Sequence, residues 1–349
     1  MFQRRDFLKA SLGVVGGLAL SRFGWADDAT SMTDITATAS KFLAALNDDQ
    51  RKAVQFDAGD AERFNWHFIP LNDITKQVST RKGVCLDDMD PKAKSAALEL
   101  LKLGTSADGY TWATAIMERE AILAELEPKN TWYRKPGWYF FTMFGKPAAK
   151  GTWGWRVDGH HLSVSLTITD GVIVSASPYF MGLNPVTIKH GPRKGERDTI
   201  TPCEDLAREL FLMLNKDQQK VALQAEHMPE VAGKTVKAPA KIPTGLGAEK
   251  MSNKQQELLV KLVNHYTGRM PEALAKTETD KFTKAGVEKL GFLYTGEAEA
   301  GKRHTYNIQG PSLYIHYMNE MTDPLKNPAN HIHSIYRSLT QDFGGAVPG

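Results

Sequence analysis

The sequence has little cysteine, which argues against a disulfide-bonded framework and against cysteine-based metal sites. Only Cys85 and Cys203 are present among 349 residues. In an oxidising compartment they can form one disulfide bond, but two cysteines do not make a disulfide framework. No Cys-x-x-Cys motif occurs, so a cysteine-based metal site is not expected.

The chain also lacks a charge surplus outside its first residues. The formal net charge is +3, and residues 1–26 account for it with four basic side chains against Asp6. The remainder is therefore close to neutral. Because binding phosphate requires an excess of basic side chains, neither nucleic acid nor an anionic membrane is expected as a partner.

Several catalytic and nucleotide-binding motifs are missing as well. Neither the Gly-x-Gly-x-x-Gly fingerprint nor P-loop spacing occurs, so no nucleotide cofactor is expected. The Gly-x-Ser-x-Gly elbow of serine hydrolases is absent too, which disfavours the usual kinds of nucleophilic hydrolysis.

The N-terminus has the pattern of an export signal. Residues 3–9, QRRDFLK, resemble a twin-arginine motif, and a weakly apolar run follows from Ala10 to Leu20. This run is too short to span a bilayer, so no stable membrane insertion is expected. Gly24 and Ala26 supply small residues for cleavage before Asp27. We predict a signal peptide over residues 1–26 and a periplasmic or secreted protein. The twin-arginine export route carries proteins that are already folded, often with a cofactor in place. The signal therefore favours a protein that binds a metal ion.

Residues 153–178 predict a β-hairpin. Apolar and polar side chains alternate from His161 to Thr169, as in a strand with one buried face. Asp170-Gly171 is a two-residue turn signal, and Val172 begins the return strand.

Three pairs of similar segments recur in the same order and predict an internal duplication. Helical patterns precede strand patterns in both halves, which predicts an α+β fold rather than a doubly wound one. We expect two similar helix-plus-β-hairpin halves, residues 27–204 and 205–349. The matched segments are 46–52 with 214–220, 83–92 with 245–254, and 155–168 with 306–319.

Histidines supply the candidate metal ligands. His331 and His333 are two residues apart, so on a strand they lie on one face and can approach the same ion. His160 and His161 are adjacent and would face opposite ways on a strand, so only one can join a given site. His161 follows the Ser/Thr face and is the better candidate, but the pattern leaves both open. His67, in an aromatic segment, is a further candidate, although a buried histidine bonded to backbone is the more common case.

Three charged residues are candidates for catalysis. Glu120 lies in the apolar stripe of a predicted helix, where an unpaired charge is costly, so it requires an arginine, a histidine or a metal ion. Arg81 and Arg337 can hold an anionic group. Trp153 and Trp155 share a strand face and can stack on a sugar, although aromatic pairs are more often core residues.

Long motifs across the chain resemble those of the domain of unknown function 3500 family, a group of exported proteins. The family carries no established activity, so the resemblance implies export but no reaction. One departure is at residues 315–319, IHYMN, where the family pattern usually runs IEYDN and His316 replaces an acidic residue. The matching segments are FNWHFIP, RKGVCLDDM, IMEREAIL, WGWRVDGHHLSVS, PYFMGLNP, YNIQGPSLYI and NHIHSIYR.

These observations favour a metal-dependent enzyme with its site between the two halves. His331, His333 and one of His160 or His161 would bind Zn, Cu or Fe, with Glu120 as a fourth ligand or general base. Metal-assisted hydrolysis and redox chemistry both remain open. One alternative is a non-catalytic periplasmic protein that binds a small polar or sugar-like molecule. A third is a purely structural role for the histidines.

The export signal yields a first prediction. Mature protein recovered from the periplasm of an expressing bacterium should begin at Asp27, as N-terminal sequencing would show. Replacing both Arg4 and Arg5 by lysine should leave the precursor in the cytoplasm, whereas R22K, outside the motif, should be exported normally. Unchanged export of the double variant would contradict the twin-arginine assignment.

Overall fold

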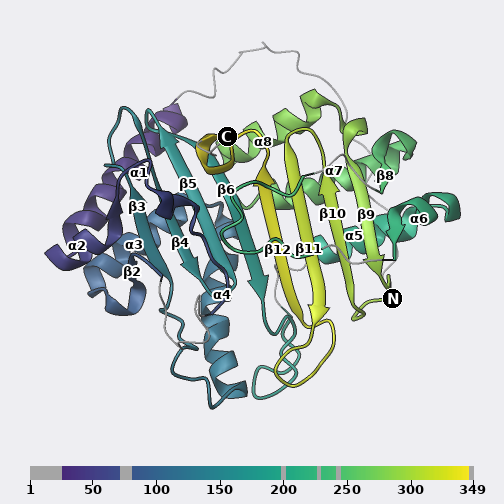
Figure 1. Ribbon diagram of the computed structural model, residues 1–349, viewed down its shortest axis with the longest axis horizontal. Coiled ribbons are helices and arrows are strands. Elements are labelled where there is room, and N and C mark those ends of the chain that lie inside the picture. Colours follow the sequence, from purple (N-terminus) through teal and green to yellow (C-terminus); the bar gives the residue numbers. More distant parts are fainter. Residues whose placement is uncertain (1–25, 71–80, 198–201, 226–228, 241–244, 346–349) are drawn as a thin grey trace, which may run out of the picture.

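The computed structural model describes residues 26–70, 81–197, 202–225, 229–240 and 245–345. It consists of one large mixed β-sheet and helices that pack mainly on one of its faces (Figure 1). The predicted α+β class is therefore confirmed. Within the described residues the helices are α1 (Ala26–Ala45), α2 (Asp48–Val54), α3 (Pro91–Leu103), α4 (Ala107–Leu126), α5 (Pro202–Met213), α6 (Lys216–Ala222), α7 (Asn253–Thr267) and α8 (Glu272–Ala285).

A single path of hydrogen-bonded strands crosses the whole molecule. The order is β1-β3-β4-β5-β6-β12-β11-β10-β9-β7, with β2 paired to β3 and β8 paired to β9. The strands are β1 (Gln55–Phe56), β2 (Val84–Cys85), β3 (Phe140–Phe144), β4 (Thr152–Gly159), β5 (Leu162–Thr169), β6 (Val172–Leu183), β7 (Leu223–Gln224), β8 (Leu246–Gly247), β9 (Gly291–Gly296), β10 (His304–Gln309), β11 (Leu313–Met321) and β12 (His331–Ser338).

The two halves of the chain have the same order of elements. In each half two helices lead into a short strand that pairs in parallel with a longer strand, β1 with β3 and β7 with β9. Two further helices and an antiparallel meander follow. Asn47 and Asn215, which match in sequence, cap α2 and α6 with the same capping box. The duplication itself stays a prediction, and the predicted boundary between residues 204 and 205 lies in the first turn of α5.

The halves join at the centre of the sheet, where β6 pairs antiparallel with β12. Residues 179–183 of β6 lie opposite residues 332–336 of β12. Because this pairing is continuous with the rest of the sheet, strands from both halves share one surface on each side (Figure 1).

The predicted hairpin is present as β5 and β6, with Asp170 and Gly171 in the turn. Its apolar face packs under the helices, and β4 extends it on the other side. Trp153 and Trp155 on β4 are 0% and 1% exposed within this core, so neither ring is available to stack on a sugar. His160 and His161 are not on a strand, contrary to the alternation argument. They form the two-residue turn between β4 and β5, and His161 has a φ of 62°.

The opposite face of the sheet is covered by loops rather than helices. The segments at residues 57–70 and 229–240 pass in front of the strands in Figure 1. They are joined to each other, because the Lys234 amide donates to the Trp66 carbonyl at 2.9 Å and the Trp66 indole donates to the Thr235 carbonyl at 3.2 Å. A second apolar cluster under these loops contains Trp66, Phe68, Phe180, Val231, Tyr314, Ile335 and Phe343.

The two cysteines are free and buried, so the disulfide bond that an oxidising compartment permits is not formed. No helix in the described part of the chain combines the length and hydrophobicity that crossing a membrane requires.

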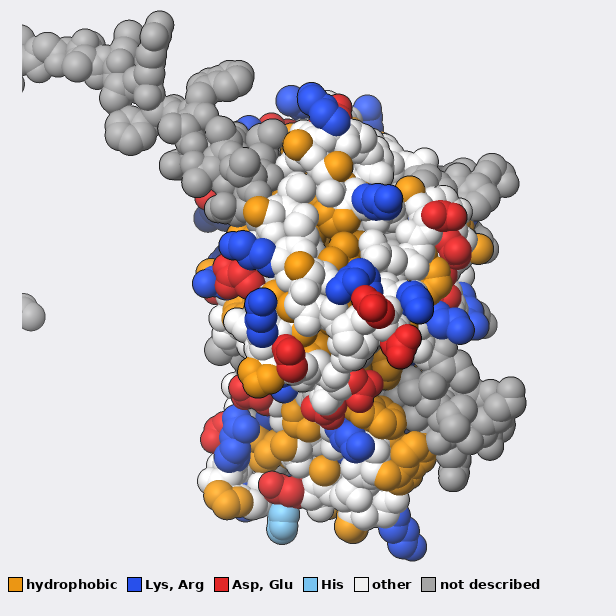
Figure 2. Space-filling model, turned by 90° about the vertical axis from the view of Figure 1, so that its left-hand side faces the viewer, with side chains coloured by type: hydrophobic (Ala, Val, Ile, Leu, Met, Phe, Trp, Pro, Cys, Tyr) orange, Lys and Arg blue, Asp and Glu red, His pale blue; other side chains and the backbone are white. Residues whose placement is uncertain are grey.

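Figure 2 shows the end of the molecule formed by the first half of the chain. Acidic and basic side chains alternate over this surface, and neither sign of charge dominates it.

Arg337, predicted to hold an anionic group, instead fastens a loop to the sheet. Its side chain is fully buried and donates to Asp342 at 2.8 Å. It also donates to the carbonyls of Thr235 and Val236 at 3.1 and 2.7 Å. Because Asp342 and two backbone carbonyls bind this guanidinium, the structure supports a structural role for Arg337.

Replacing Arg337 by methionine should therefore destabilise the fold. Removing one partner of a buried ion pair leaves Asp342 unpaired, which costs about 3–5 kcal/mol in the free energy of unfolding. Chemical denaturation measures this loss, and R303M, at an exposed arginine, is the matched control. An R337M variant as stable as R303M would contradict the structural role.

Candidate metal centre

Three histidine side chains meet on the loop-covered face, where the halves join. His161 comes from the turn before β5, and His331 and His333 come from the start of β12. Their Nε2 atoms are 2.8 Å apart for His161 and His331, 3.0 Å for His161 and His333, and 3.1 Å for His331 and His333. Within the described residues this is the one group of three or more potential ligands close enough to share a metal ion.

The local backbone explains how His161 reaches the other two. Its amide donates to the Phe68 carbonyl, and its carbonyl accepts from the Gly182 amide, both at 2.8 Å. These bonds and the left-handed φ turn the side chain toward β12, across β6. The sequence left open whether His160 or His161 joins the site. The structure shows that His161 is the one that lies beside His331 and His333.

Gly182 makes room for this approach. It lies opposite His333 in the β6–β12 register. A Cβ atom at this position would lie 3.0 Å from the Cδ2 atoms of both His161 and His333 and 2.7 Å from the Ile332 carbonyl oxygen. Only glycine leaves the space that these two rings occupy.

Two of the three rings have a second partner outside the cluster. His333 Nδ1 contacts the carboxylate of Glu230, and His331 is hydrogen-bonded to the backbone of Thr322. The Nε2 atoms of His331 and His333 lie 3.1 Å apart, and each is also within 3.0 Å of Nε2 of His161. Such an arrangement favours a cation between them.

Burial keeps two of the three rings neutral. Burial is the main cause that holds the pKa values of His161 and His331 well below the ordinary value of 6.5, and neighbouring histidines add to it. Neutral imidazole is the form that binds metal ions. A tetrahedral zinc centre has metal–nitrogen bonds of about 2.0–2.1 Å, which places its nitrogens about 3.3 Å apart, close to the spacing found here.

Two phenylalanines form an apolar wall beside the cluster. The rings of Phe68 and Phe180 stack with centroids 3.9 Å apart, and each lies 5.3 Å from the ring of His333 at a steep angle. One ring comes from the covering loop and the other from β6, so the loop takes part in enclosing the site.

Glu120 lies behind the three histidines rather than among them. It is 3% exposed on α4 and contacts Nδ1 of His160, while Arg134 lies 3.7 Å away. The sequence required a cationic or histidine partner for this carboxylate, and both are present. Burial raises the pKa of Glu120 to about 8, and Arg134 opposes this shift. The His160 ring packs against His161 with centroids 3.7 Å apart and a tilt of 30°, so the Glu120–His160 pair supports the site from behind.

The other two predicted residues lie outside the cluster. His67 Nε2 is 3.2 Å from the Asn65 side-chain oxygen, and burial is the main cause that lowers its pKa to about 4. Arg81 donates hydrogen bonds to the backbone carbonyls of Ile69 and Pro70, so its guanidinium is bound by the backbone.

Glu230 and Arg134 were not identified from the sequence. Glu230 lies in a loop rich in Lys, Pro, Gly and Ala, and its one available signal was an acidic residue in a basic segment. Arg134 binds Glu127 at 2.9 Å and His160 at 3.0 Å, and no motif marks it.

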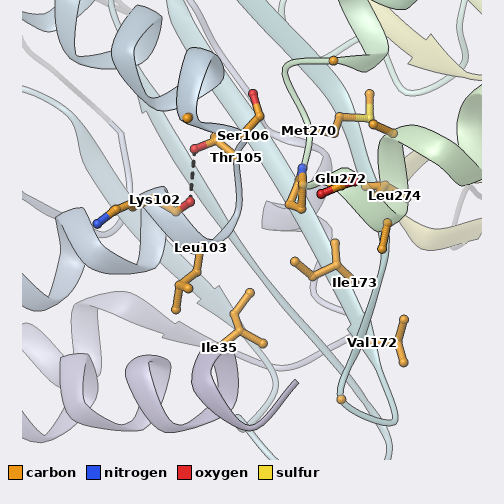
Figure 3. Close-up of a pocket in the computed structure, with 16 residues that line it drawn as sticks. Ile35, Lys102, Leu103, Thr105, Ser106, Val172, Ile173, Met270, Glu272 and Leu274 are labelled. Atoms are coloured by element: carbon orange, nitrogen blue, oxygen red, sulfur yellow. Dashed lines mark hydrogen bonds between the residues drawn. The ribbon is translucent and has the colours of Figure 1, made fainter. Parts of the chain in front are cut away.

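A separate cavity of about 760 Å³ lies on the helix side of the sheet, between α1, α3 and α8 (Figure 3). Aliphatic side chains, among them Ile35, Leu103, Ile173 and Leu274, point into it. None of the predicted site residues lines this cavity, so the helix-side cavity and the three-histidine cluster are distinct features.

Comparison with known proteins places the chain in one family. No curated protein and no solved structure matches it. The family described as Protein of unknown function (DUF3500) matches residues 28–345, which is nearly the whole chain. The chain therefore belongs to the DUF3500 family.

Proposed function

We propose that this protein is an exported metal-dependent enzyme whose metal ion is bound by His161, His331 and His333. The observation that carries the proposal is the convergence of three Nε2 atoms within 3.1 Å of one another. Three protein ligands leave a coordination position for water or substrate, as in catalytic rather than structural sites.

The donor set limits the metal and its chemistry. Three imidazole ligands suit Zn, Cu or Fe and disfavour Mg or Ca, which prefer oxygen ligands. Such a metal supplies either an activated water for hydrolysis or a redox centre.

The surrounding residues hold the ligands in place. Glu230 and the Thr322 backbone fix the ring orientations of His333 and His331, as carboxylates and carbonyls do behind metal-bound histidines. The His160 ring, held by Glu120, packs against His161. Phe68 and Phe180 keep water away from one side of the cluster.

The location of the cluster agrees with a site shared by two halves. His161 belongs to the first half, and His331 and His333 belong to the second. We propose that the halves arose by duplication and that the twin-arginine route exports the protein after folding, with the metal in place. The sugar-binding alternative loses its main support, because Trp153 and Trp155 are core residues.

Metal uptake tests the proposal directly. Wild-type protein stripped with a chelator should take up about one equivalent of Zn, Cu or Fe and gain thermal stability, because a ligand that binds only the folded state stabilises it. Elemental analysis after gel filtration measures the uptake. H161A, H331A and H333A should each lose it, whereas H190A, at an exposed histidine, should retain it. Wild-type protein that takes up none of the three metals would refute the proposal.

Gly182 offers a test that leaves all three ligands in the chain. In G182A the new methyl group would push the His161 and His333 rings apart. Because metal affinity depends on ligand geometry, we expect affinity to fall at least tenfold. Competition against a chromophoric chelator gives the affinity, and circular dichroism shows whether the sheet is intact. A folded G182A protein with wild-type affinity would contradict the geometry described here.

A further inference from the structure

His316 is a buried histidine to which the described residues offer no hydrogen-bond partner. It lies on β11, is 2% exposed, and neither Nδ1 nor Nε2 makes a hydrogen bond within the described structure. Leaving a buried polar group unpaired is unfavourable, so native proteins rarely do so without a bound water or ligand. The imidazole therefore points to an occupant that the described residues do not supply.

The strand register places His316 beside the three-histidine cluster. His316 lies opposite Ile335 on β12, and Met318 lies opposite His333. His316 and His333 are thus diagonal neighbours on the same face, a relation in which long side chains interact. The electrostatic influence of both Glu230 and His333 on His316 agrees with this position.

An imidazole ring keeps at least one N–H donor in either protonation state. A neutral imidazole has one N–H to donate and one lone pair. Beside a metal centre, that N–H can bind an oxygen atom of a ligand that the metal also holds.

We propose that His316 is a substrate-contacting residue that donates a hydrogen bond to an oxyanion bound at the His161–His331–His333 metal centre. This inference rests on the proposed function. The class of ligand it indicates is a carboxylate, with one oxygen for the metal and a second for His316. His316 would then select for substrates with an acidic or acyl oxygen next to the reacting group.

Cobalt(II) provides a spectroscopic test, with acetate as the probe. Wild-type protein loaded with cobalt should show a saturable change in its visible bands as acetate is added. H316L should load the same amount of cobalt but bind acetate at least tenfold more weakly. H316Q keeps an N–H donor and should recover most of the affinity.

His304 supplies the matched control. It is also a buried histidine with an unpaired Nε2, but it stacks between Tyr294 and Tyr317 in the core under the helices. H304L should therefore leave acetate affinity unchanged. Should H316L fail to fold, H316Q and H316N provide the comparison, since the shorter asparagine should bind acetate more weakly than glutamine.

The outcomes separate this inference from the proposed function. Wild-type protein that binds no cobalt would overturn both. Cobalt-loaded wild-type and H316L proteins with equal acetate affinity would overturn the role of His316 alone, as would wild-type protein that loads cobalt but does not bind acetate. Loss of cobalt from H316L would also overturn it, because His316 would then act on the metal rather than on the ligand.

Discussion

The contact on which the candidate site depends is the approach of three imidazole lone pairs from two distant parts of the chain. Lone pairs at 2.8–3.1 Å repel one another unless a proton or a cation lies between them. His333 Nδ1 contacts the Glu230 carboxylate, and the Thr322 backbone is hydrogen-bonded to His331, so both rings have partners outside the cluster. The surrounding fold therefore holds together an arrangement that is unfavourable by itself, which is typical of a preformed metal site.

The continuous sheet makes this arrangement rigid. The pairing of β6 with β12 fixes Gly182 opposite His333. The His161 carbonyl accepts a hydrogen bond from the Gly182 amide, so the turn that carries His161 is fixed relative to His333 as well. The long loops then close the same face, and each brings a residue to the site, Phe68 from one and Glu230 from the other. Buried groups such as Arg337 anchor these loops, so residues far from the three histidines help to keep the candidate site closed.

Sequence reasoning succeeded where a pattern has a short, local physical cause. The spacing of His331 and His333 predicted a shared face because side chains in a strand alternate, and both rings do point to one cluster. The same rule failed at His160 and His161, because these residues form a turn, in which alternation does not apply. Glu230 was missed because its position depends on how a long loop folds back over the sheet, and no periodic pattern records such a path.

By itself, the sequence determined the α+β class, the β5–β6 hairpin and the family, since hydrophobic periodicity, turn chemistry and long motifs are encoded locally. It also supplied most of the histidines that form the candidate site. Only the tertiary structure decided which of them meet, because the pairing of β6 with β12 joins positions some 170 residues apart in the chain. It also showed that Arg337 is bonded to Asp342 and to loop carbonyls, and that His316 has no hydrogen-bond partner among the described residues. These facts depend on what lies next to a side chain in space, which the order of residues along the chain does not specify.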